Sequence, residues 1–320
     1  MEGLVVRYLV PSGTSLRLPV IGQGTWGFGD NPARHKQEVE ALRRGFELGM
    51  TLVDTAELYG AGESERVVGD AIADCRDAIF LITKIWPSHA KPDAMRRALE
   101  GSLRRMRTDH VDACLLHWPT KSQPVSRIAQ GLRALQESGL TREVGVSNFP
   151  TAMAEQTLAA LGMREGDRRG GVFFHELPYS LEERRVELTL LPQTQEAGGV
   201  LLAYSPLGHG RLLRHEGPGF DALRQVAGRH HITPAQAALA FLAAEDAVVV
   251  LAKASSAVHV TENAESGDVV LDGEDLGRLR AGFRRGRKDI GISLPPSQSF
   301  FSLAYGGISF MQSLRGRNRA

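Results

Sequence analysis

The chain has 320 residues, an apolar fraction of 42% and a formal net charge of +1. This length fits one large α/β barrel or two smaller domains, and the apolar fraction suffices for a sizeable core. Charges of both signs are well mixed, which gives no reason to expect a nucleic acid or an anionic membrane as a partner. We find no basic and apolar N-terminal signal and no apolar run long enough to span a bilayer, so a cytoplasmic protein is expected. The two cysteines, Cys75 and Cys114, lack metal-ligand spacing, and no metal site is expected.

The first residues predict a β-hairpin in which Leu4–Val10 and Ser15–Pro19 flank a Pro-Ser-Gly turn. From residue 20 onward, short apolar runs typical of buried strands alternate with segments of helical periodicity. The expected strands are Val20–Gly27 (which ends in a glycine-rich loop), Thr51–Val53, Ile79–Thr83, Val111–Leu116, Arg142–Asn148, Gly171–Glu176, Val200–Tyr204 and Ala247–Leu251. The expected helices are His35–Leu48, Glu63–Ala73, Pro92–Met106, Ser126–Ser138, Thr151–Leu161, Glu182–Gln195, Phe220–Arg229, Pro234–Ala243 and Val258–Glu265.

Eight strand–helix units in this length favour a closed (β/α)8 TIM barrel of α/β class over residues 20–265. An open, doubly wound parallel sheet is the alternative, but the dinucleotide fingerprint GxGxxG of such sheets is absent. We expect one domain over residues 1–320. It would carry the N-terminal hairpin and, over about 272–320, a C-terminal helix (Asp275–Phe283) followed by a long loop or tail.

Three successive predicted strands are followed at once by Asp54, Lys84 and His117, and Tyr59 lies one short loop after the first of them. In a parallel barrel these strand ends meet at one face, where active sites of such barrels lie. A buried ion pair between Asp54 and Lys84 would offset the desolvation of both charges. The Lys84 ammonium is expected to lower the pKa of Tyr59, so that this phenol could protonate a carbonyl oxygen oriented by His117.

All three tryptophans, Trp26, Trp86 and Trp118, follow predicted strand ends on the same face. They predict an aromatic wall for a small apolar or carbonyl-bearing substrate. Packing at the barrel rim is the alternative for any one of them. A structural ion pair and a core histidine are likewise the alternatives for Asp54, Lys84 and His117 taken singly.

The sequence resembles the aldo-keto reductase superfamily, in particular the bacterial diketogulonate-reductase-like branch. The motifs that carry the resemblance occur in order: Gly24-Thr25-Trp26, Asp54-Thr-Ala-Glu-Leu-Tyr59-Gly60, Thr83-Lys84, Leu116-His117-Trp118-Pro119, Gly145-Val146-Ser147-Asn148 and Tyr204-Ser205-Pro206-Leu207. The resemblance implies a catalytic tetrad of Asp54, Tyr59, Lys84 and His117. It also implies NADPH-dependent reduction of an aldehyde or ketone, with the hydride coming from nicotinamide C4 and the proton from Tyr59.

The resemblance further implies residues that contact the cofactor. At the nicotinamide these are Gly24, Thr25, Trp26, Ser147, Asn148, Glu176 and the ring-stacking Tyr179, and along the pyrophosphate they are Tyr204, Ser205, Leu207 and Gly210. Glu176 stands where the family usually has glutamine, and an ionised glutamate cannot donate a hydrogen bond to the carboxamide.

The adenosine end is implied to contact Lys253, His259, Glu262 and Asn263. Here Ala254 and His259 replace the serine and the arginine of the family pattern. Arginine offers a fixed bidentate fork to a phosphate and histidine does not. We therefore expect a reduced preference for NADPH, with NADH as an alternative cofactor, and NADPH affinity that rises as the pH falls through about 6.5.

The tail carries Phe300, Phe301 and Tyr305, which could cover the pocket, pack on the barrel or face a partner. The physiological substrate cannot be read from it, and the family suggests a monomer. A second class of function stays open at this point: a nucleotide-binding barrel with little catalysis, acting as a regulatory or interaction subunit.

Overall fold

The computed structural model describes residues 6–120, 123–163, 171–214 and 216–286. The predicted hairpin residues before 6 and the tail beyond 286, with Phe300, Phe301 and Tyr305, lie outside the described residues.

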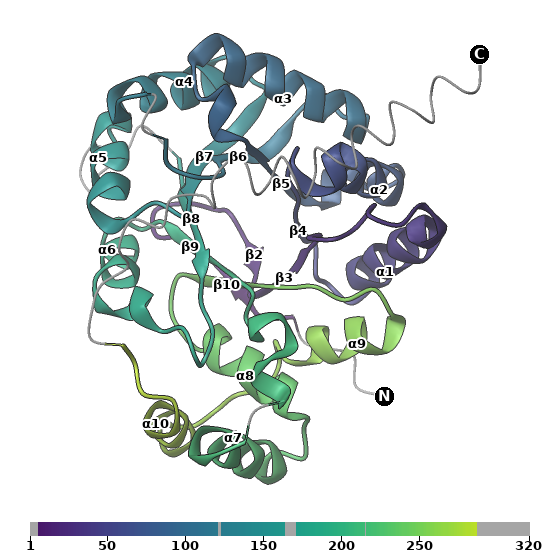
Figure 1. Ribbon diagram of the computed structural model, residues 1–320, viewed down its shortest axis with the longest axis vertical. Coiled ribbons are helices and arrows are strands. Elements are labelled where there is room, and N and C mark those ends of the chain that lie inside the picture. The colour runs from purple at the N-terminus through teal and green to yellow at the C-terminus, as the bar shows by residue number, and fades with distance from the viewer. Residues whose placement is uncertain (1–5, 121–122, 164–170, 215, 287–320) are drawn as a thin grey trace.

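Eight parallel strands close into a barrel in the order β10-β3-β4-β5-β6-β7-β8-β9 (Figure 1). The strands are β3 (Ile21–Gly24), β4 (Leu52–Asp54), β5 (Phe80–Ile85), β6 (Val111–Leu116), β7 (Thr141–Ser147), β8 (Phe173–Pro178), β9 (Val200–Tyr204) and β10 (Val248–Ala252). The predicted (β/α)8 barrel is confirmed, and the open sheet is excluded because β10 pairs with both β3 and β9.

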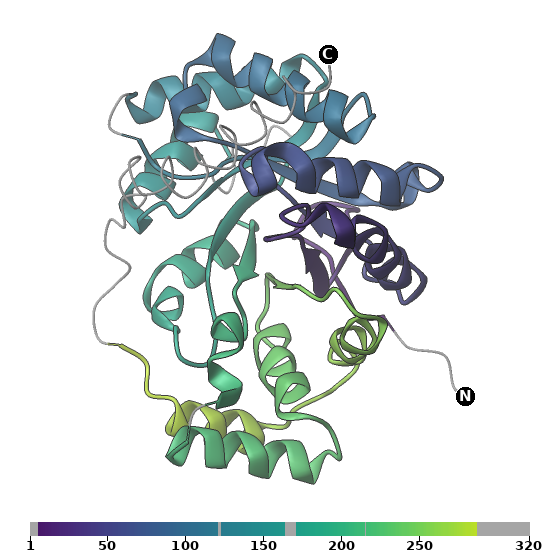
Figure 2. The same cartoon turned by 45° about the vertical axis from the view of Figure 1, so that its right-hand side comes forward.

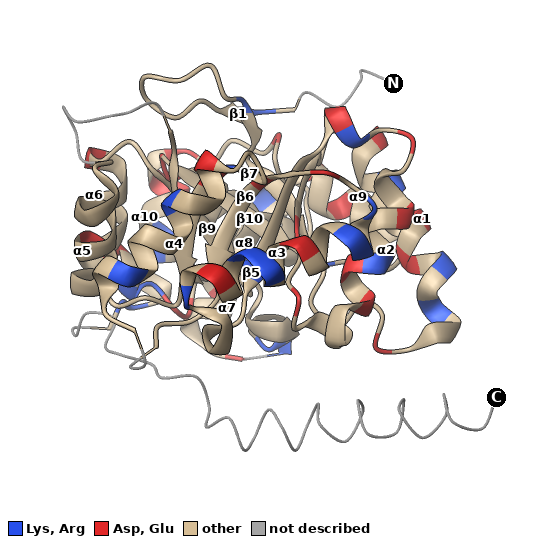
Figure 3. Cartoon of the chain, turned by 90° about the horizontal axis from the view of Figure 1, so that it is seen from above, with Lys and Arg blue, Asp and Glu red and all other residues tan. Residues whose placement is uncertain are grey.

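Helices surround the barrel on its outer side (Figures 1 and 2). They are α1 (His35–Glu47), α2 (Glu63–Ile72), α3 (Pro92–Met106), α4 (Val125–Glu137), α5 (Thr151–Leu161), α6 (Leu190–Glu196), α7 (Pro218–Arg229), α8 (Pro234–Ala243), α9 (Ala257–Glu265) and α10 (Gly273–Gly282). Lysine, arginine and acidic residues are interspersed over these helices (Figure 3).

Within the described residues, the N-terminal hairpin pairs over β1 (Tyr8–Leu9) and β2 (Leu18–Pro19), a shorter stretch than predicted. Figure 3 places β1 at one end of the barrel. Leu18 of the hairpin is fully buried in the cluster that fills the barrel interior, so the hairpin closes this end. A ligand must therefore enter from the other end, at the carboxyl ends of the strands.

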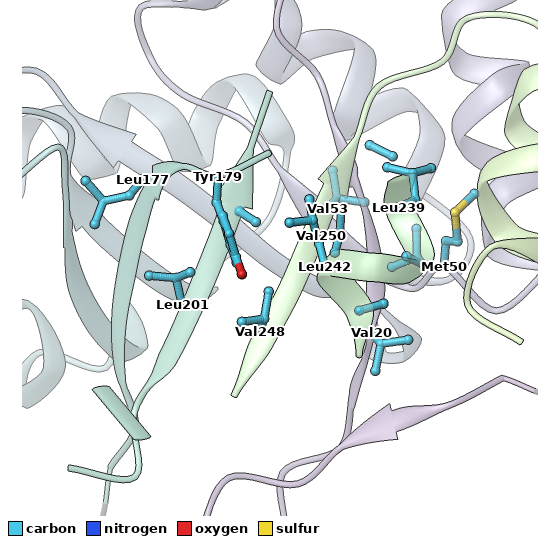
Figure 4. Close-up of a cluster of buried hydrophobic side chains, with 14 of the residues drawn as sticks. Val20, Met50, Val53, Leu177, Tyr179, Leu201, Leu239, Leu242, Val248 and Val250 are labelled. Carbon is cyan, nitrogen blue, oxygen red and sulfur yellow. The ribbon is translucent and has the colours of Figure 1, made fainter. Parts of the chain in front are cut away.

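Side chains alternate between the barrel interior and the layer under the helices, as strand geometry requires. The interior cluster contains Leu52, Ile82, Leu115, Phe174, Leu202 and Leu251. Their outward neighbours include Val53, Leu201 and Val250, which pack under the helices (Figure 4).

The same alternation decides which polar residues face the interior at the carboxyl end. Each lies two positions after one of the apolar interior residues. They are Asp54, Lys84, His117, Glu176, Tyr204 and Lys253.

The predicted helix Glu182–Gln195 is wrong in its first half. Residues 185–188 form a single 3₁₀ turn, and α6 starts only at Leu190. The side chain of Arg184 is 5% exposed, donates to Glu187 and donates to the backbone oxygen of Phe283. This segment is therefore organised by a long-range contact with the residues after α10, which a local pattern cannot reveal.

Candidate active site

A cavity of about 950 Å³ opens at the carboxyl ends of the strands. Its inner end lies at Tyr59, His117 and Glu176, and its outer end at Lys253, His259 and Glu262. The full lining is Gly24, Trp26, Asp54, Leu58, Tyr59, His117, Trp118, Asn148, Glu176, Tyr204–Gly210 without Gly208, Leu213, Phe220, Thr233–Ala235, Leu251–Ser255, His259, Glu262 and Asn263.

Lys84 is the centre of the inner end, although its side chain is fully buried behind the wall. Its Nζ lies 2.6 Å from Asp54 Oδ1 and donates to Asp54 Oδ2 over 2.7 Å. It also donates to the Tyr59 hydroxyl oxygen over 3.1 Å and to the backbone oxygen of Thr55. Burial lowers the pKa of Lys84, but the carboxyl groups of Asp54 and Glu176 together with Tyr59 raise it above its ordinary value. Lys84 is therefore a cation.

Tyr59 lies at the start of a 3₁₀ turn, Tyr59–Gly62, in which Gly60 and Gly62 adopt φ angles of +56° and +91°. Side chains rarely allow this backbone conformation, so the glycines permit the tight turn that points the phenol at Lys84. Burial raises the pKa of Tyr59 far above its usual value, and Lys84 opposes this only in part. The expected lowering by Lys84 is therefore present but is exceeded by the effect of burial, and Tyr59 holds its proton.

His117 lines the cavity beside Tyr59, with the two ring centroids 5.5 Å apart. Burial and, secondarily, the Lys84 charge hold the pKa of His117 well below its ordinary value, so the imidazole is neutral. A neutral imidazole retains one N–H donor for a ligand oxygen. The backbone oxygen of His117 accepts a 3.0 Å hydrogen bond from Asn148 Nδ2, which fixes the strand end.

Asn148 and Tyr204 form the opposite wall of the inner end. Asn148 has a left-handed backbone, with φ +61°, which asparagine tolerates better than most residues. Its Oδ1 accepts a 2.7 Å hydrogen bond from the Tyr204 hydroxyl. Of the predicted pair, only Asn148 lines the cavity. Ser147 is buried behind the wall and is not among the lining residues.

Tyr179 does not occupy the predicted stacking position. Its side chain is fully buried under the helices among Leu177, Leu201 and Val248 (Figure 4), and its hydroxyl donates to Glu187. Residue 179 follows the last residue of β8, where the alternation turns it outward. Among the described residues, Tyr204 is the tyrosine other than Tyr59 that lines the cavity.

Two of the three tryptophans line the cavity. Trp26 packs edge-on against Tyr59 with ring centroids 5.0 Å apart, and Trp118 follows His117. Trp86 is instead set back, with its ring edge-on to His117 at 5.6 Å. Thr25 is also behind the wall, where its hydroxyl donates to the backbone oxygen of Asp54.

The segment after β9 lines the cavity between its inner and outer ends. It contributes the predicted Ser205, Leu207 and Gly210, and also His209, which sequence reasoning missed. Ser205 and His209 both adopt left-handed backbone conformations, and their side chains are 3.2 Å apart. The non-glycine left-handed positions could not have been recognised from the residue types.

The outer end is exposed and carries mixed charge. Lys253 lines it and lies with its Nζ over the buried ring of Phe28 at 5.4 Å. His259 Nδ1 is 2.9 Å from Glu262 Oε2. Arg34, which the sequence did not single out, comes from the loop before α1 and donates to the Ser255 hydroxyl over 2.7 Å.

The cavity fits a nicotinamide dinucleotide. Its volume lies at the upper end of the range of about 300–1,000 Å³ for cofactor sites. Polar amide and phenol groups stand at the inner end, and Lys253 with its neighbour Arg34 offers positive charge for phosphate at the outer end. No group of three His, Cys, Asp or Glu in the described ranges could hold a metal ion. No helix in the same ranges is long and apolar enough to cross a membrane.

Residues 20–282 match the Aldo/keto reductase family, so the chain belongs to this family. Methylglyoxal reductase YeaE of Escherichia coli (strain K12) is 36% identical over 262 residues, 82% of this chain and 90% of YeaE. Methylglyoxal reductase DkgB of Salmonella typhimurium is 30% identical over 271 residues, 83% of this chain and 93% of DkgB.

A solved structure with the same fold is an aldo/keto reductase from Klebsiella pneumoniae in complex with NADP and acetate. It has a TM-score of 0.80 and 35% identity, and the match covers 92% of this chain and 100% of that one. The chain is accordingly an NADP(H)-dependent oxidoreductase that reduces carbonyl groups.

Proposed function

We propose that Tyr59 is the proton donor of this reductase and that the favoured substrate is a small, uncharged aldehyde or ketone such as a 2-oxoaldehyde. The observation that carries the first part is the 3.1 Å hydrogen bond from Lys84 Nζ to the hydroxyl oxygen of a phenol that lines the cavity.

The hydride for the carbonyl carbon would come from NADPH when this cofactor is bound. Tyr59 donates its proton to the carbonyl oxygen, and the Lys84 ammonium stabilises the phenolate that remains. Asp54 keeps Lys84 charged and oriented, because an unpaired buried ammonium would be costly. The neutral His117 holds the carbonyl oxygen by its N–H, while Trp26 and Trp118 exclude water from the reacting atoms.

The charges around the cavity support an uncharged substrate. Among the described lining residues, Lys253 at the outer end is the single lysine, and arginine is absent. The inner end instead presents the carboxyl groups of Asp54 and Glu176. A substrate carboxylate bound there would face carboxyl oxygens and phenols, with no cation among the lining residues of this end to pair with it. Two relatives named as methylglyoxal reductases support the same class.

The test compares methylglyoxal with pyruvate, which has the same three-carbon skeleton but a carboxylate in place of the aldehyde. NADPH consumption should be fast with methylglyoxal and slower by at least about 100-fold, in kcat/KM, with pyruvate. Tyr59→Phe is the control for the proton donor. Equal rates with both substrates contradict the proposed specificity. NADPH binding without turnover of any carbonyl would instead favour the regulatory subunit.

Cofactor selection at the outer end is assigned to Lys253 and Arg34. Burial lowers the pKa of Lys253, and the nearby Arg34 charge adds to this effect, so the two cations share one region of the wall. A 2′-phosphate would relieve the repulsion between them. Arg34 thus takes the place of the arginine that the family has at the position of His259, and NADPH is favoured over NADH.

The chain is further proposed to act as a monomeric, single-domain cytoplasmic protein without a nucleic-acid partner. The interspersed surface charges and the net charge of +1 support this. The two free cysteines fit a reducing compartment.

A further inference from the structure

Glu176 brings a second carboxyl group to a single buried cation. Its Oε2 lies 3.3 Å from Lys84 Nζ, compared with 2.6 Å for Asp54 Oδ1. The side chains of Lys84, Asp54 and Glu176 are 0%, 5% and 2% exposed. With both carboxyl groups ionised, the three side chains would carry a net charge of −1 in a site nearly without water.

Asp54 Oδ1 and Glu176 Oε2 both lie against Lys84 Nζ, at 2.6 and 3.3 Å, but neither of these ion-pair contacts has the geometry of a hydrogen bond. The two carboxyl groups lie close enough to hydrogen bond with each other. Ionised carboxylates are acceptors only, so neither can satisfy the other. One proton placed between the two groups provides the missing donor and removes the excess charge.

We propose that Glu176 is a titratable member of the active site that shares one proton with Asp54, and that only this protonated form supports carbonyl reduction. The proposal rests on the proposed role of Tyr59 as proton donor. Lys84 contacts Asp54 more closely than Glu176, so the shared proton resides on Glu176. A protonated carboxyl group both donates and accepts, as an amide does, and can serve the cofactor carboxamide in the same way.

The surroundings explain why the proton is retained and what its loss does. Burial and then Asp54 raise the pKa of Glu176 to about 8, against the opposing effect of Lys84. The other titratable groups near the inner end are Tyr59, His117 and Tyr204, all uncharged. Ionised Glu176 would place an unpaired negative charge beside Lys84, strengthen the hold of Tyr59 on its proton and withdraw a donor from the cofactor site.

The first experiment is the pH profile of kcat/KM for wild type and Glu176→Gln with methylglyoxal. Glutamine reproduces the shape, donor and acceptor of the protonated acid. Each profile is normalised to its value near pH 6, where the side chain of residue 176 is uncharged in both proteins. Wild type should lose activity by about tenfold per pH unit above about pH 8, while Glu176→Gln stays level.

The matched control is Glu143→Gln. Glu143 lies in β7, outside the cavity lining, and burial raises its pKa to about 7. This variant removes a half-buried glutamate elsewhere in the barrel without touching the site, so its alkaline profile should equal that of wild type. An alkaline loss that persists in Glu176→Gln, or that disappears in Glu143→Gln, overturns the proposal.

The second experiment does not depend on activity. Infrared difference spectra between about pH 6.5 and 9.5 report the carbonyl stretch of a protonated carboxyl group that titrates in this range. Because Glu143 also titrates in this range, the spectra are recorded in the Glu143→Gln background. The band should be present in Glu143→Gln and in Glu143→Gln/Tyr59→Phe, and absent in Glu143→Gln/Glu176→Gln. Its presence in the variant that also lacks the Tyr59 hydroxyl separates the two proposals, because that variant tests the carboxyl titration without the proposed donor. A band that survives in Glu143→Gln/Glu176→Gln, or no band in Glu143→Gln, overturns the sharing of a proton.

Discussion

The inner and outer ends of the cavity differ in how far their charged side chains are buried. At the inner end, Asp54, Lys84 and Glu176 are almost fully buried, and each charge depends on its neighbours. At the outer end, the His259 side chain is 70% exposed and its pairing with Glu262 is solvated. A buried unpaired charge costs several kcal/mol, whereas an exposed pair contributes about 0–1 kcal/mol. Substitutions at the inner end should therefore affect catalysis strongly, whereas substitutions at the outer end should change cofactor preference by small amounts.

Departures from the family pattern illustrate the difference. Glutamate in place of glutamine at residue 176 changes the charge of a closed site, which must respond by keeping a proton. Histidine in place of arginine at residue 259 removes a charge from an open site, and Arg34 reaches the same region from another part of the chain. At the buried site the added charge is neutralised by a proton, and at the exposed site the lost charge is supplied by a nearby residue, Arg34.

The largest effect is expected from breaking the inner end at its donor. Tyr59→Phe removes the hydroxyl group while leaving the ring packed against Trp26. We expect kcat to fall by about 10²–10⁴-fold, the usual contribution of a general acid. The dissociation constant of NADPH, measured by quenching of tryptophan fluorescence, should change little. Activity near the wild-type level would refute the role of Tyr59.

Stability should report the buried proton of Glu176. A carboxyl group whose pKa is higher in the folded chain binds more protons when folded. The free energy of unfolding therefore falls as the pH rises from about 4.5 to about 8, the unfolded and folded values. Glu176→Gln should gain about 2–4 kcal/mol relative to wild type between pH 5 and 9.

Urea unfolding at both pH values measures this gain. Glu143→Gln is again the comparison, since its own gain should be complete near pH 7, where the Glu143 pKa lies. An unchanged difference between wild type and Glu176→Gln across the range would show that Glu176 is already ionised at low pH.

Arg34→Ala should weaken the outer end selectively. We expect NADPH to bind about five- to tenfold more weakly, because a guanidinium contact to the 2′-phosphate is lost, with NADH binding unchanged. Lys36→Ala is the matched control: it removes the same charge from α1, where the Lys36 side chain is 91% exposed and near Glu40. NADPH affinity is measured by isothermal titration. Equal losses of affinity in both variants would mean that Arg34 acts only by long-range electrostatic attraction.

The smallest effect is expected at His259. His259→Arg should tighten NADPH binding by about threefold, because a permanent guanidinium replaces imidazole at an exposed position. Isothermal titration with NADPH measures this effect. An affinity equal to that of wild type would place residue 259 outside the phosphate site.

Much of the barrel and of the inner end could be predicted from local patterns. The alternation of apolar runs with helical periodicity predicted eight units, and the strand ends predicted the convergence of Asp54, Lys84 and His117. Both patterns reflect backbone geometry that is independent of distant contacts. The prediction of a helix before α6 was wrong because Arg184 donates a hydrogen bond to the distant backbone oxygen of Phe283.

The site was less predictable wherever several elements act on one side chain. The expected low pKa of Tyr59 considered Lys84 alone, whereas burial exceeds its effect in the structure. The family resemblance implies Tyr179 as the stacking ring. The alternation of β8 places it under the helices instead.

By itself, the sequence determined the (β/α)8 architecture, the family and the polar residues at the strand ends, because these follow from periodicity and from order along the chain. Only the tertiary structure decided that Tyr204 rather than Tyr179 lines the cavity, that Arg34 joins Lys253, and that Glu176 and Asp54 face one lysine. Such properties depend on burial and on distances between residues far apart in the chain, and no local pattern of residue types encodes either.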